Sequence, residues 1–238
     1  PVTSSRVSDA FNAADQIEFT GGKKNTINFE FVKGRLKARY YMSSPQAAVR
    51  YFEKMYEDMP TNENKYAYIS ALQANGQTDR ALHQMDELLK KFSKNLILNI
   101  TKSEILLSGQ RLNEAQENID QVLNIAPGNY PASIIKSKIL SSKKEFIKAE
   151  EILRDLLIGK NRDPGLWIQL SEVQRAGKNI VGYHLSRGEY YTLIGDFDNA
   201  LNQFQFALGL SGNSFQTSET IMTKIKFAKE RLGKRRGF

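Results

Sequence analysis

Residues 188–207, GEYYTLIGDFDNALNQFQFA, predict two antiparallel helices joined by a tight turn. In the first helix Gly188 precedes Tyr191 by three residues, and in the second Ala200 precedes Phe204 by four. Helices whose facing residues are as small as glycine and alanine can approach closely, and aromatic side chains then fill the space beside the contact. We therefore expect Gly188 and Ala200 at the closest approach of these helices.

The turn between the two helices is expected at Gly195 and Asp196. Glycine adopts the left-handed conformation that commonly ends a helix, and an aspartate side chain accepts hydrogen bonds from the free N–H groups of the following first turn. One such hairpin cannot bury its apolar faces by itself, so similar hairpins should lie beside it.

Alanines in equivalent second helices recur along the chain at nearly constant intervals. Ala48, Ala81, Ala115 and Ala149 are separated by 33, 34 and 34 residues. The next such alanine, Ala200, follows after 51 residues, which is one and a half of these periods. We therefore expect an additional helix in this interval that serves as the second helix of one pair and the first helix of the next.

The apolar periodicity and the capping residues give the bounds of the expected helices. Gly76, Gly109 and Gly177 are expected at the turns. The expected helical pairs are 31–42 with 45–59, then 62–92, 95–127 and 129–158, followed by helices at 163–176 and 180–194, the second helix of the quoted stretch, and a capping helix at about 214–232.

The G-x₂-Y…A-x₃-F spacing and the interval between alanines resemble the tetratricopeptide repeat. This resemblance implies an all-α solenoid, a superhelix of about 12 to 13 helices, in which the first helix of each pair lines the concave surface and binds a protein or peptide. Tyr40 and Tyr66 would be aromatic anchors there. Aligned on the alanines, the partner-binding groove should contain Lys33, Lys37, Tyr40, Tyr66, Ser70, Gln73, Glu104, Lys138, Glu172 and Arg175, with Ile97, Ile100, Ile134 and Ile168.

The composition argues against an enzyme active site in this chain. The 238 residues include no cysteine, and the two histidines, His83 and His184, have no further ligand at a recognisable spacing. The sequence has no H-E-x-x-H and no glycine-rich nucleotide motif, so we expect neither a catalytic residue nor a bound metal or cofactor. It also lacks an apolar run of ~18 residues, so no transmembrane segment is expected.

The charge balance gives a net charge of +8. Such an excess invites an anionic partner. The basic residues are dispersed, however, and only Lys234, Arg235 and Arg236 form a cluster. We therefore expect a solvated surface and no nucleic-acid partner.

The N-terminal stretch Pro1 to Asp15, PVTSSRVSDAFNAAD, begins a second amphipathic pattern. A helix is expected at 4–19, and TGGKKN at 20–25 then interrupts the periodicity as a linker would. The apolar face of the expected helix consists of Val7, Ala10, Phe11, Ala14 and Ile17.

Pro1, Arg6 and Val7 resemble the end of the catalytic domain in HExxH zinc metallopeptidases that assist outer-membrane β-barrel assembly in the bacterial periplasm. In that family a His-Pro pair is followed after four residues by arginine and an aliphatic residue. The resemblance implies that histidine precedes Pro1, that an H-E-x-x-H helix lies further upstream, and that zinc belongs to the parent protease domain and not to this fragment. It divides the chain into the last protease helix with its linker (1–28), the repeats (29–212) and a capping helix with a basic tail (213–238).

By the same resemblance the fragment is a non-catalytic, periplasmic recognition domain. Its partners would be the adjoining protease domain and outer-membrane β-barrel proteins or their assembly machinery. Two alternatives stay open at this point. One is a free-standing adaptor of a secretion or pilus assembly system, and the other is a helical-repeat nucleic-acid binder, which the net charge of +8 suggests and steep salt dependence would support.

Overall fold

The computed structural model describes residues 26–40, 42–212 and 215–236, and in these residues every regular element is an α-helix. The helix expected at 4–19 lies outside the described residues. None of the described helices is long and apolar enough to cross a membrane. The helices are α2 (Ile27–Tyr40), α3 (Pro45–Asp58), α4 (Asn62–Ala74), α5 (Thr78–Lys91), α6 (Leu96–Ser108), α7 (Leu112–Ile125), α8 (Tyr130–Ser142), α9 (Phe146–Lys160), α10 (Pro164–Ala176), α11 (Ile180–Leu193), α12 (Phe197–Leu210) and α13 (Phe215–Arg236).

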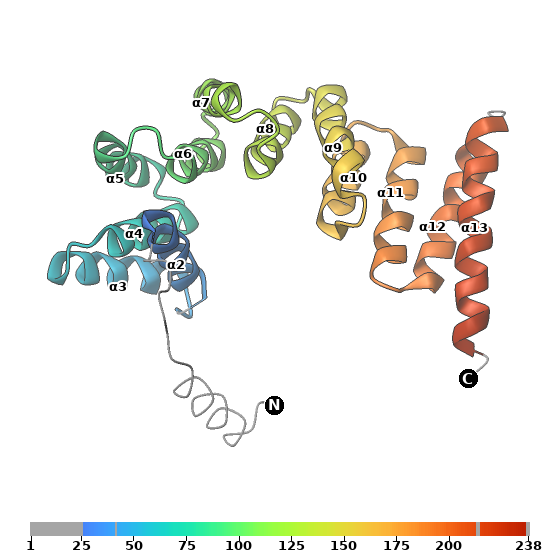
Figure 1. Cartoon of the computed structure of the whole chain (residues 1–238), viewed down its shortest axis with the longest axis horizontal. Helices are drawn as coiled ribbons and strands as arrows, with labels where there is room; N and C mark the ends of the chain where they lie inside the picture. Colours follow the sequence, from blue (N-terminus) through green and yellow to red (C-terminus); the bar gives the residue numbers. More distant parts are fainter. Residues whose placement is uncertain (1–25, 41, 213–214, 237–238) are drawn as a thin grey trace, which may run out of the picture.

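The helices form an open arch (Figure 1), in which each helix from α3 onward packs on the next one in the chain. Helices α4, α6 and α8 lie toward the inner side of the arch, whereas α5 and α7 lie toward the outer side. Helix α6 also contacts α8 directly. This arrangement confirms the predicted all-α solenoid, because each helical pair buries its apolar faces only against its neighbours.

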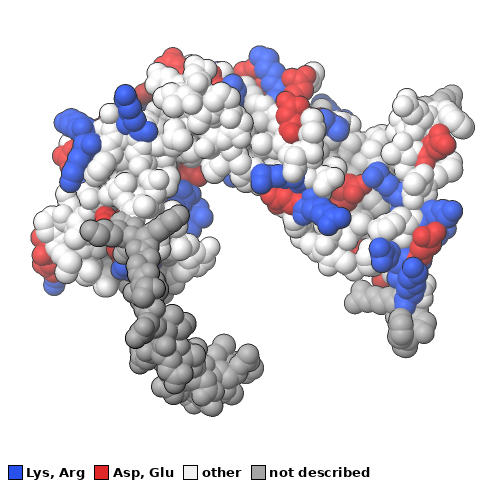
Figure 2. Space-filling model, in the orientation of Figure 1, with Lys and Arg blue, Asp and Glu red and all other residues white. Residues whose placement is uncertain are grey.

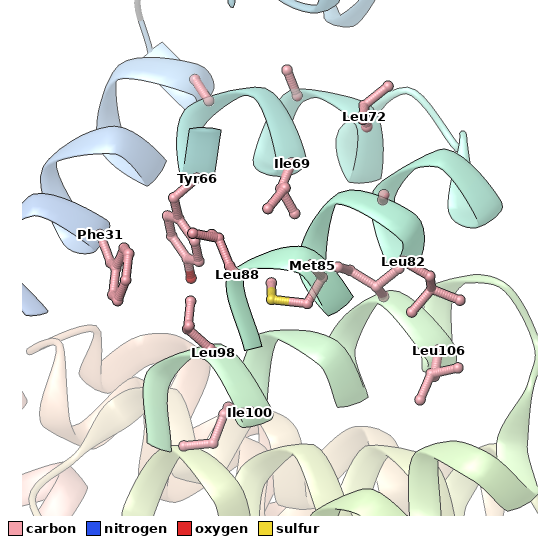
Figure 3. Packing of buried hydrophobic residues seen from close by; sticks show 14 of the residues in the cluster. Phe31, Tyr66, Ile69, Leu72, Leu82, Met85, Leu88, Leu98, Ile100 and Leu106 are labelled. Atoms are coloured by element: carbon pink, nitrogen blue, oxygen red, sulfur yellow. The ribbon is translucent and has the colours of Figure 1, made fainter. Parts of the chain in front are cut away.

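The residues at the predicted small and large positions of the second helices form the core. Ala81, Ala115, Ala149 and Ala200 are all fully buried, and the large residues four positions later, Met85, Ile119, Leu153 and Phe204, are buried beside them. Figure 3 shows Met85 of α5 near Leu88 of the same helix and near Ile69 of α4 and Leu98 of α6. The alignment on alanines is therefore correct.

The quoted hairpin packs closely at the expected place. A Cβ atom on Gly188 would lie 2.3 Å from Cε1 of Phe204, so α11 and α12 can approach only because residue 188 has no side chain. Gly195 has φ +77°, and the Asp196 side chain accepts a hydrogen bond from the backbone N–H of Asn199. The end of α11 and the start of α12 are therefore capped as predicted.

Each turn between the two helices of a pair has one residue in the left-handed conformation. The sequence predicted the position of this residue correctly in some turns and not in others. This residue is Gly76, Gln110, Lys144, Lys178 or Gly195, so the positions follow the period of 34 residues and then the half period of 17. Gly109 and Gly177, which were expected at the turns, have φ values of −82° and −80° and precede the left-handed residue. Glycine is needed there for space, because a Cβ on either would clash with Thr78 or Phe146.

The prediction that α2 and α3 form the first hairpin is wrong. Helix α2 packs along α4, and α3 packs on α4 as well, while α2 and α3 have no comparable contact with each other. The close crossing depends on Gly34, since a Cβ there would lie 2.5 Å from the backbone oxygen of Glu63. Between ring centroids, Phe31 of α2 lies 5.1 Å from Tyr66 (Figure 3) and 5.8 Å from Phe92. Helix α2 thus covers the inner side of α4.

The helix that serves two pairs is α11. A polar network joins it to the two helices that precede it, α9 and α10. Glu150 of α9 accepts hydrogen bonds from Gln174 of α10 at 2.9 Å and from Asn179 at 3.3 Å. Ser186 of α11 in turn donates to the Gln174 side-chain oxygen at 2.7 Å. Gln174 and Ser186 are buried. Apolar clusters lie on both sides of this joint, one at α8–α10 and another at α11–α13.

Candidate functional site

The main candidate site is a groove of about 550 Å³ between the inner helices α6, α8 and α10. We call it the inner groove. Apolar side chains from these helices and from α9 line it together with hydroxyl, amide and charged groups. Its lining residues are Leu107, Ser108, Gln110, Ser137, Lys138, Ser141, Ser142, Leu153, Ile168, Gln169, Glu172 and Val173.

The repeat period explains why these side chains meet. Residues 34 positions apart occupy the same place on successive inner helices, so Lys138 and Glu172 project into the groove from α8 and α10. Leu107 and Ser141 occupy a second equivalent place. Gln73 and Arg175, which were predicted, belong to the same place, whereas Leu107 and Ser141 were not predicted, although adding one and two periods of 34 residues to position 73 gives them.

The charges in the inner groove are exposed. Glu172 pairs with Arg175, one turn along α10, at 2.6 Å. Lys138 is exposed and has no ion pair among the described residues. The buried Ser137 hydroxyl, in contrast, donates a hydrogen bond to the Ala149 carbonyl oxygen at 3.1 Å. The groove therefore offers a free cation, a partly neutralised carboxylate and apolar surface within one concavity.

The predicted site residues of the first two pairs do not join this groove. Lys33 and Lys37 lie on α2 and form ion pairs with Glu63 at 3.1 and 2.6 Å. The Glu63 carboxylate is largely buried, which alone would raise its pKa, but hydrogen bonds from both lysines outweigh burial and lower the pKa overall. These lysines hold α2 on α4 and are not available as a free basic wall.

Tyr66 is not the exposed aromatic anchor that the sequence predicted. Its side chain is fully buried under α2, and its hydroxyl shares a 2.6 Å hydrogen bond with Thr101. Ser70 is also buried, and its hydroxyl donates to the Tyr66 carbonyl oxygen. The prediction was wrong because it assumed that α2 lies beside α4 as an equivalent inner helix, which would leave Tyr66 exposed.

A second hollow, the N-terminal hollow, lies between α2 and the helices α6 and α8. Glu104, a predicted site residue, lies at its wall and forms a 2.8 Å ion pair with Arg35 of α2. Tyr40 lies on the opposite wall and is 76% exposed. The remaining lining is Val32, Leu36, Arg39, Tyr66, Ile97, Ile100, Thr101 and Pro131.

Two other predicted groove residues, Gln73 and Ile134, and the two histidines have separate surroundings. Gln73 is half-buried and Ile134 is buried, so neither is a wall of the inner groove. His184 Nδ1 lies 2.9 Å from the Gln203 side-chain oxygen, while His83 lies beside Arg80 and Gln84. Across the part of the chain that the structure describes, no group of three or more His, Asp or Glu side chains is placed to hold a metal ion.

Basic and acidic residues alternate over the surface. Figure 2 shows Lys and Arg interspersed with Asp and Glu on the face in view, without a broad patch of one sign. Several of these pairs join different helices, including Lys102 with Asp86 and Lys136 with Asp120. On this face the basic residues are therefore dispersed among acidic ones, as the sequence predicted.

Comparison with known proteins identifies the fold without a close relative. No family model matches the sequence, and no curated protein does either. The similar solved structures include three that each cover most of the chain. A tetratricopeptide repeat protein from Parabacteroides merdae has 15% identity and a TM-score of 0.52, covering 94% of this chain and 90% of its own.

A thermophilic tetratricopeptide protein of Thermus thermophilus has 18% identity and a TM-score of 0.50, covering 84% of this chain and 99% of its own. The Cut9-Hcn1 hetero-tetramer of the APC/C has 14% identity and a TM-score of 0.52, covering 98% of this chain and 48% of that chain. These likenesses, the buried alanines and the turns that repeat after 34 residues together identify the chain as a tetratricopeptide-repeat solenoid.

Proposed function

We propose that this chain is a non-catalytic protein–protein interaction domain that holds a protein segment in the inner groove. The observation that carries the proposal is the concave groove at α6, α8 and α10, where apolar surface lies beside the ammonium group of Lys138, which forms no ion pair with another described residue. Recognition sites in proteins commonly combine an apolar lining with a few placed polar groups.

The shape of the groove favours an extended segment of mixed polarity. Equivalent positions on neighbouring inner helices, Leu107 with Ser141 and Lys138 with Glu172, contribute to the lining, so a bound chain can contact α6, α8 and α10 in turn. Ile168 and Leu107 would contact apolar side chains, and Lys138 would attract a carboxylate of the partner. The groove carries no catalytic constellation in this proposal, and the domain acts only by binding.

The parent protein that we propose is a periplasmic HExxH zinc metallopeptidase of the β-barrel assembly-enhancing type. The support for this finer proposal is the match of Pro1, Arg6 and Val7 to the end of that catalytic domain. The zinc would belong to the parent protease domain. The clients would be outer-membrane β-barrel proteins or their assembly machinery, and tethering them beside a protease would raise their effective concentration at its active site.

Substitutions in the inner groove test the proposal. The probe is a fluorescently labelled, urea-unfolded outer-membrane β-barrel protein, diluted into buffer and titrated with the chain while anisotropy is measured. The double variant Lys138→Ala/Ile168→Ala should weaken binding about tenfold or more, because anchors of this kind contribute ~1–2 kcal/mol each. The control Lys90→Ala removes an exposed lysine from the outer helix α5 and should leave the affinity unchanged.

Circular dichroism of each variant ensures that a loss of affinity reflects the groove and not unfolding. If the double variant remains folded and binds as tightly as the original chain, the inner groove is not the binding site. If the original chain itself does not bind the β-barrel protein but binds other unfolded proteins through the groove, only the client class is wrong.

A further inference from the structure

Helix α2 is apolar on two opposite faces, but only one of them is packed. Phe31, Gly34 and Ala38 are buried against α4. On the other side Phe29, Val32, Leu36 and Tyr40 are 50%, 46%, 52% and 76% exposed; we call these four residues the α2 stripe. At about 100° per residue the centres of the two faces lie roughly 165° apart. A helix that is apolar all round is normally a buried helix.

The contacts of α2 prevent it from turning the stripe inward. Gly34 crosses α4 so closely that the two backbones are almost in contact. Arg35 is paired with Glu104 of α6, and Lys37 with Glu63 of α4, at 2.8 and 2.6 Å. A rotation of α2 would break both pairs and would expose the ring of Phe31. The stripe must therefore be covered by a further element if it is to be covered at all.

The stripe borders the N-terminal hollow, which has apolar side chains on its other wall. Val32, Leu36 and Tyr40 face Ile97 and Ile100 of α6 and Pro131 of α8 across about 330 Å³. An amphipathic helix placed here would contact α2 with one part of its apolar face and α6 with another part. Such a three-sided contact buries more apolar area than docking on an isolated helix would.

We propose that residues 4–19 of this chain occupy the N-terminal hollow as an amphipathic helix antiparallel to α2. Residues 1–25, which the structure does not describe, lead directly into α2. Residues 4–19 are therefore the nearest segment of the chain that could occupy the hollow. Its apolar face comprises Val7, Ala10, Phe11, Ala14 and Ile17. Residues 20–26, with two glycines, connect it to Ile27, and this length is typical of connections between antiparallel helices. This inference does not rest on the proposed function.

Charge and length agree with this pairing. Three of the four basic residues of α2 are paired with Glu63 or Glu104, and the fourth, Arg39, lines the hollow. Residues 4–19 carry three acidic residues and one basic residue, so their net charge is opposite to that of Arg39. The segment would be a helix of about 24 Å, and α2 is about 21 Å long. Antiparallel packing would bring Ala10 beside Leu36, because each lies nine residues from the end of its helix at the connection.

Disulfide formation tests the pairing, since the chain contains no cysteine of its own. The full chain with Ala10→Cys and Leu36→Cys is oxidised mildly at low protein concentration, and the crosslink is located by mass spectrometry. The matched control carries Asn12→Cys with Leu36→Cys, which moves the first thiol to the opposite face of the segment. A short flexible connection alone gives both pairs a millimolar effective concentration, so only the ratio of their rates reports docking.

We expect the Ala10 pair to form its intramolecular disulfide at least tenfold faster than the Asn12 pair. Adding Val32→Asp should remove this advantage, whereas Val32→Ile should preserve it, and circular dichroism should show folded repeats in both. Equal rates for the two faces would overturn the proposal. A disulfide formed mainly between two molecules would also overturn it, because a second copy of the chain would then be the occupant.

Discussion

At the scale of single residues, three turns place a side chain in a backbone conformation that favours glycine. Gln110, Lys144 and Lys178 have φ values of 59°, 64° and 62° at the position where two other turns have Gly76 and Gly195. An L-residue in this conformation costs ~1–2 kcal/mol, because its Cβ approaches the backbone carbonyl. These turns form because the helices that they join are held by tertiary packing.

Lys144→Gly and Lys178→Gly should therefore each stabilise the chain, by up to ~1 kcal/mol after the greater freedom of glycine in the unfolded state is subtracted. Urea denaturation measures the change. Gly76→Ala is the matched reverse substitution: a Cβ there has no atom within 4 Å, so its cost of ~1 kcal/mol would be backbone strain alone. If Lys144→Gly and Lys178→Gly destabilised the chain and Gly76→Ala stabilised it, this explanation would be wrong.

Gly188→Leu tests the closest helix contact in the molecule's C-terminal part. The new side chain would begin 2.3 Å from the Phe204 ring, which is itself buried, so α11 and α12 would have to separate. We expect a loss of ~1–3 kcal/mol or more in thermal or urea unfolding. Gly209→Ala on α12 is the control, because a Cβ there meets nothing and removal of a helical glycine stabilises by ~0.5–1 kcal/mol.

At the scale of the elements, the joint between α9, α10 and α11 depends on one carboxylate. Burial alone would raise the pKa of Glu150, but hydrogen bonds from Gln174, Arg154 and Asn179 outweigh it, and the pKa is lowered. A carboxyl whose folded pKa is lowered stabilises the fold above its unfolded pKa, and this contribution disappears as the pH falls through the folded pKa.

Glu150→Gln should therefore destabilise the chain at neutral pH, by ~1–3 kcal/mol for the lost charged hydrogen bonds. The difference between variant and original chain should shrink as the pH falls below about 4.3, the ordinary pKa of glutamate. Urea denaturation at a series of pH values measures it. Glu151→Gln, on the neighbouring residue of α9, is the control and should show neither effect. A constant difference at every pH would exclude the linkage.

At the scale of the whole molecule, the buried apolar residues that the structure describes form three clusters along the arch. One extends from α2 to α8, the second from α8 to α10, and the third joins α11, α12 and α13. The polar joint of Glu150 and Gln174 separates the last two. A solenoid whose parts contact only their neighbours need not unfold in one step.

Phe204→Ala should therefore destabilise the third cluster by ~3–5 kcal/mol without a comparable change in the first. Amide hydrogen exchange should show lost protection in α11 to α13, while α4 to α6 retain theirs. Met85→Ala is the reciprocal variant, since Met85 is fully buried in the first cluster. Uniform loss of protection in both variants would mean that the arch unfolds as a single unit.

The sequence by itself determined the repeat and its half-period interruption. A helix pair can bury its faces only if small and large residues recur at fixed offsets. The packing could therefore be predicted from the spacing of Ala81, Ala115, Ala149 and Ala200. Lys138 and Glu172 followed from the same period and lie in one groove. The inference of the repeat succeeded because it depends on contacts between helices that are neighbours in the chain.

Only the tertiary structure decided what covers the inner side of the first helices. Helix α2 carries apolar residues on two faces, and its periodicity does not state which helix receives either of them. Its packing on α4 buries Tyr66 and engages Lys33 and Lys37 in ion pairs. The accessibility of a side chain depends on elements that are distant in the sequence, and that is why the expected aromatic anchor became part of the core.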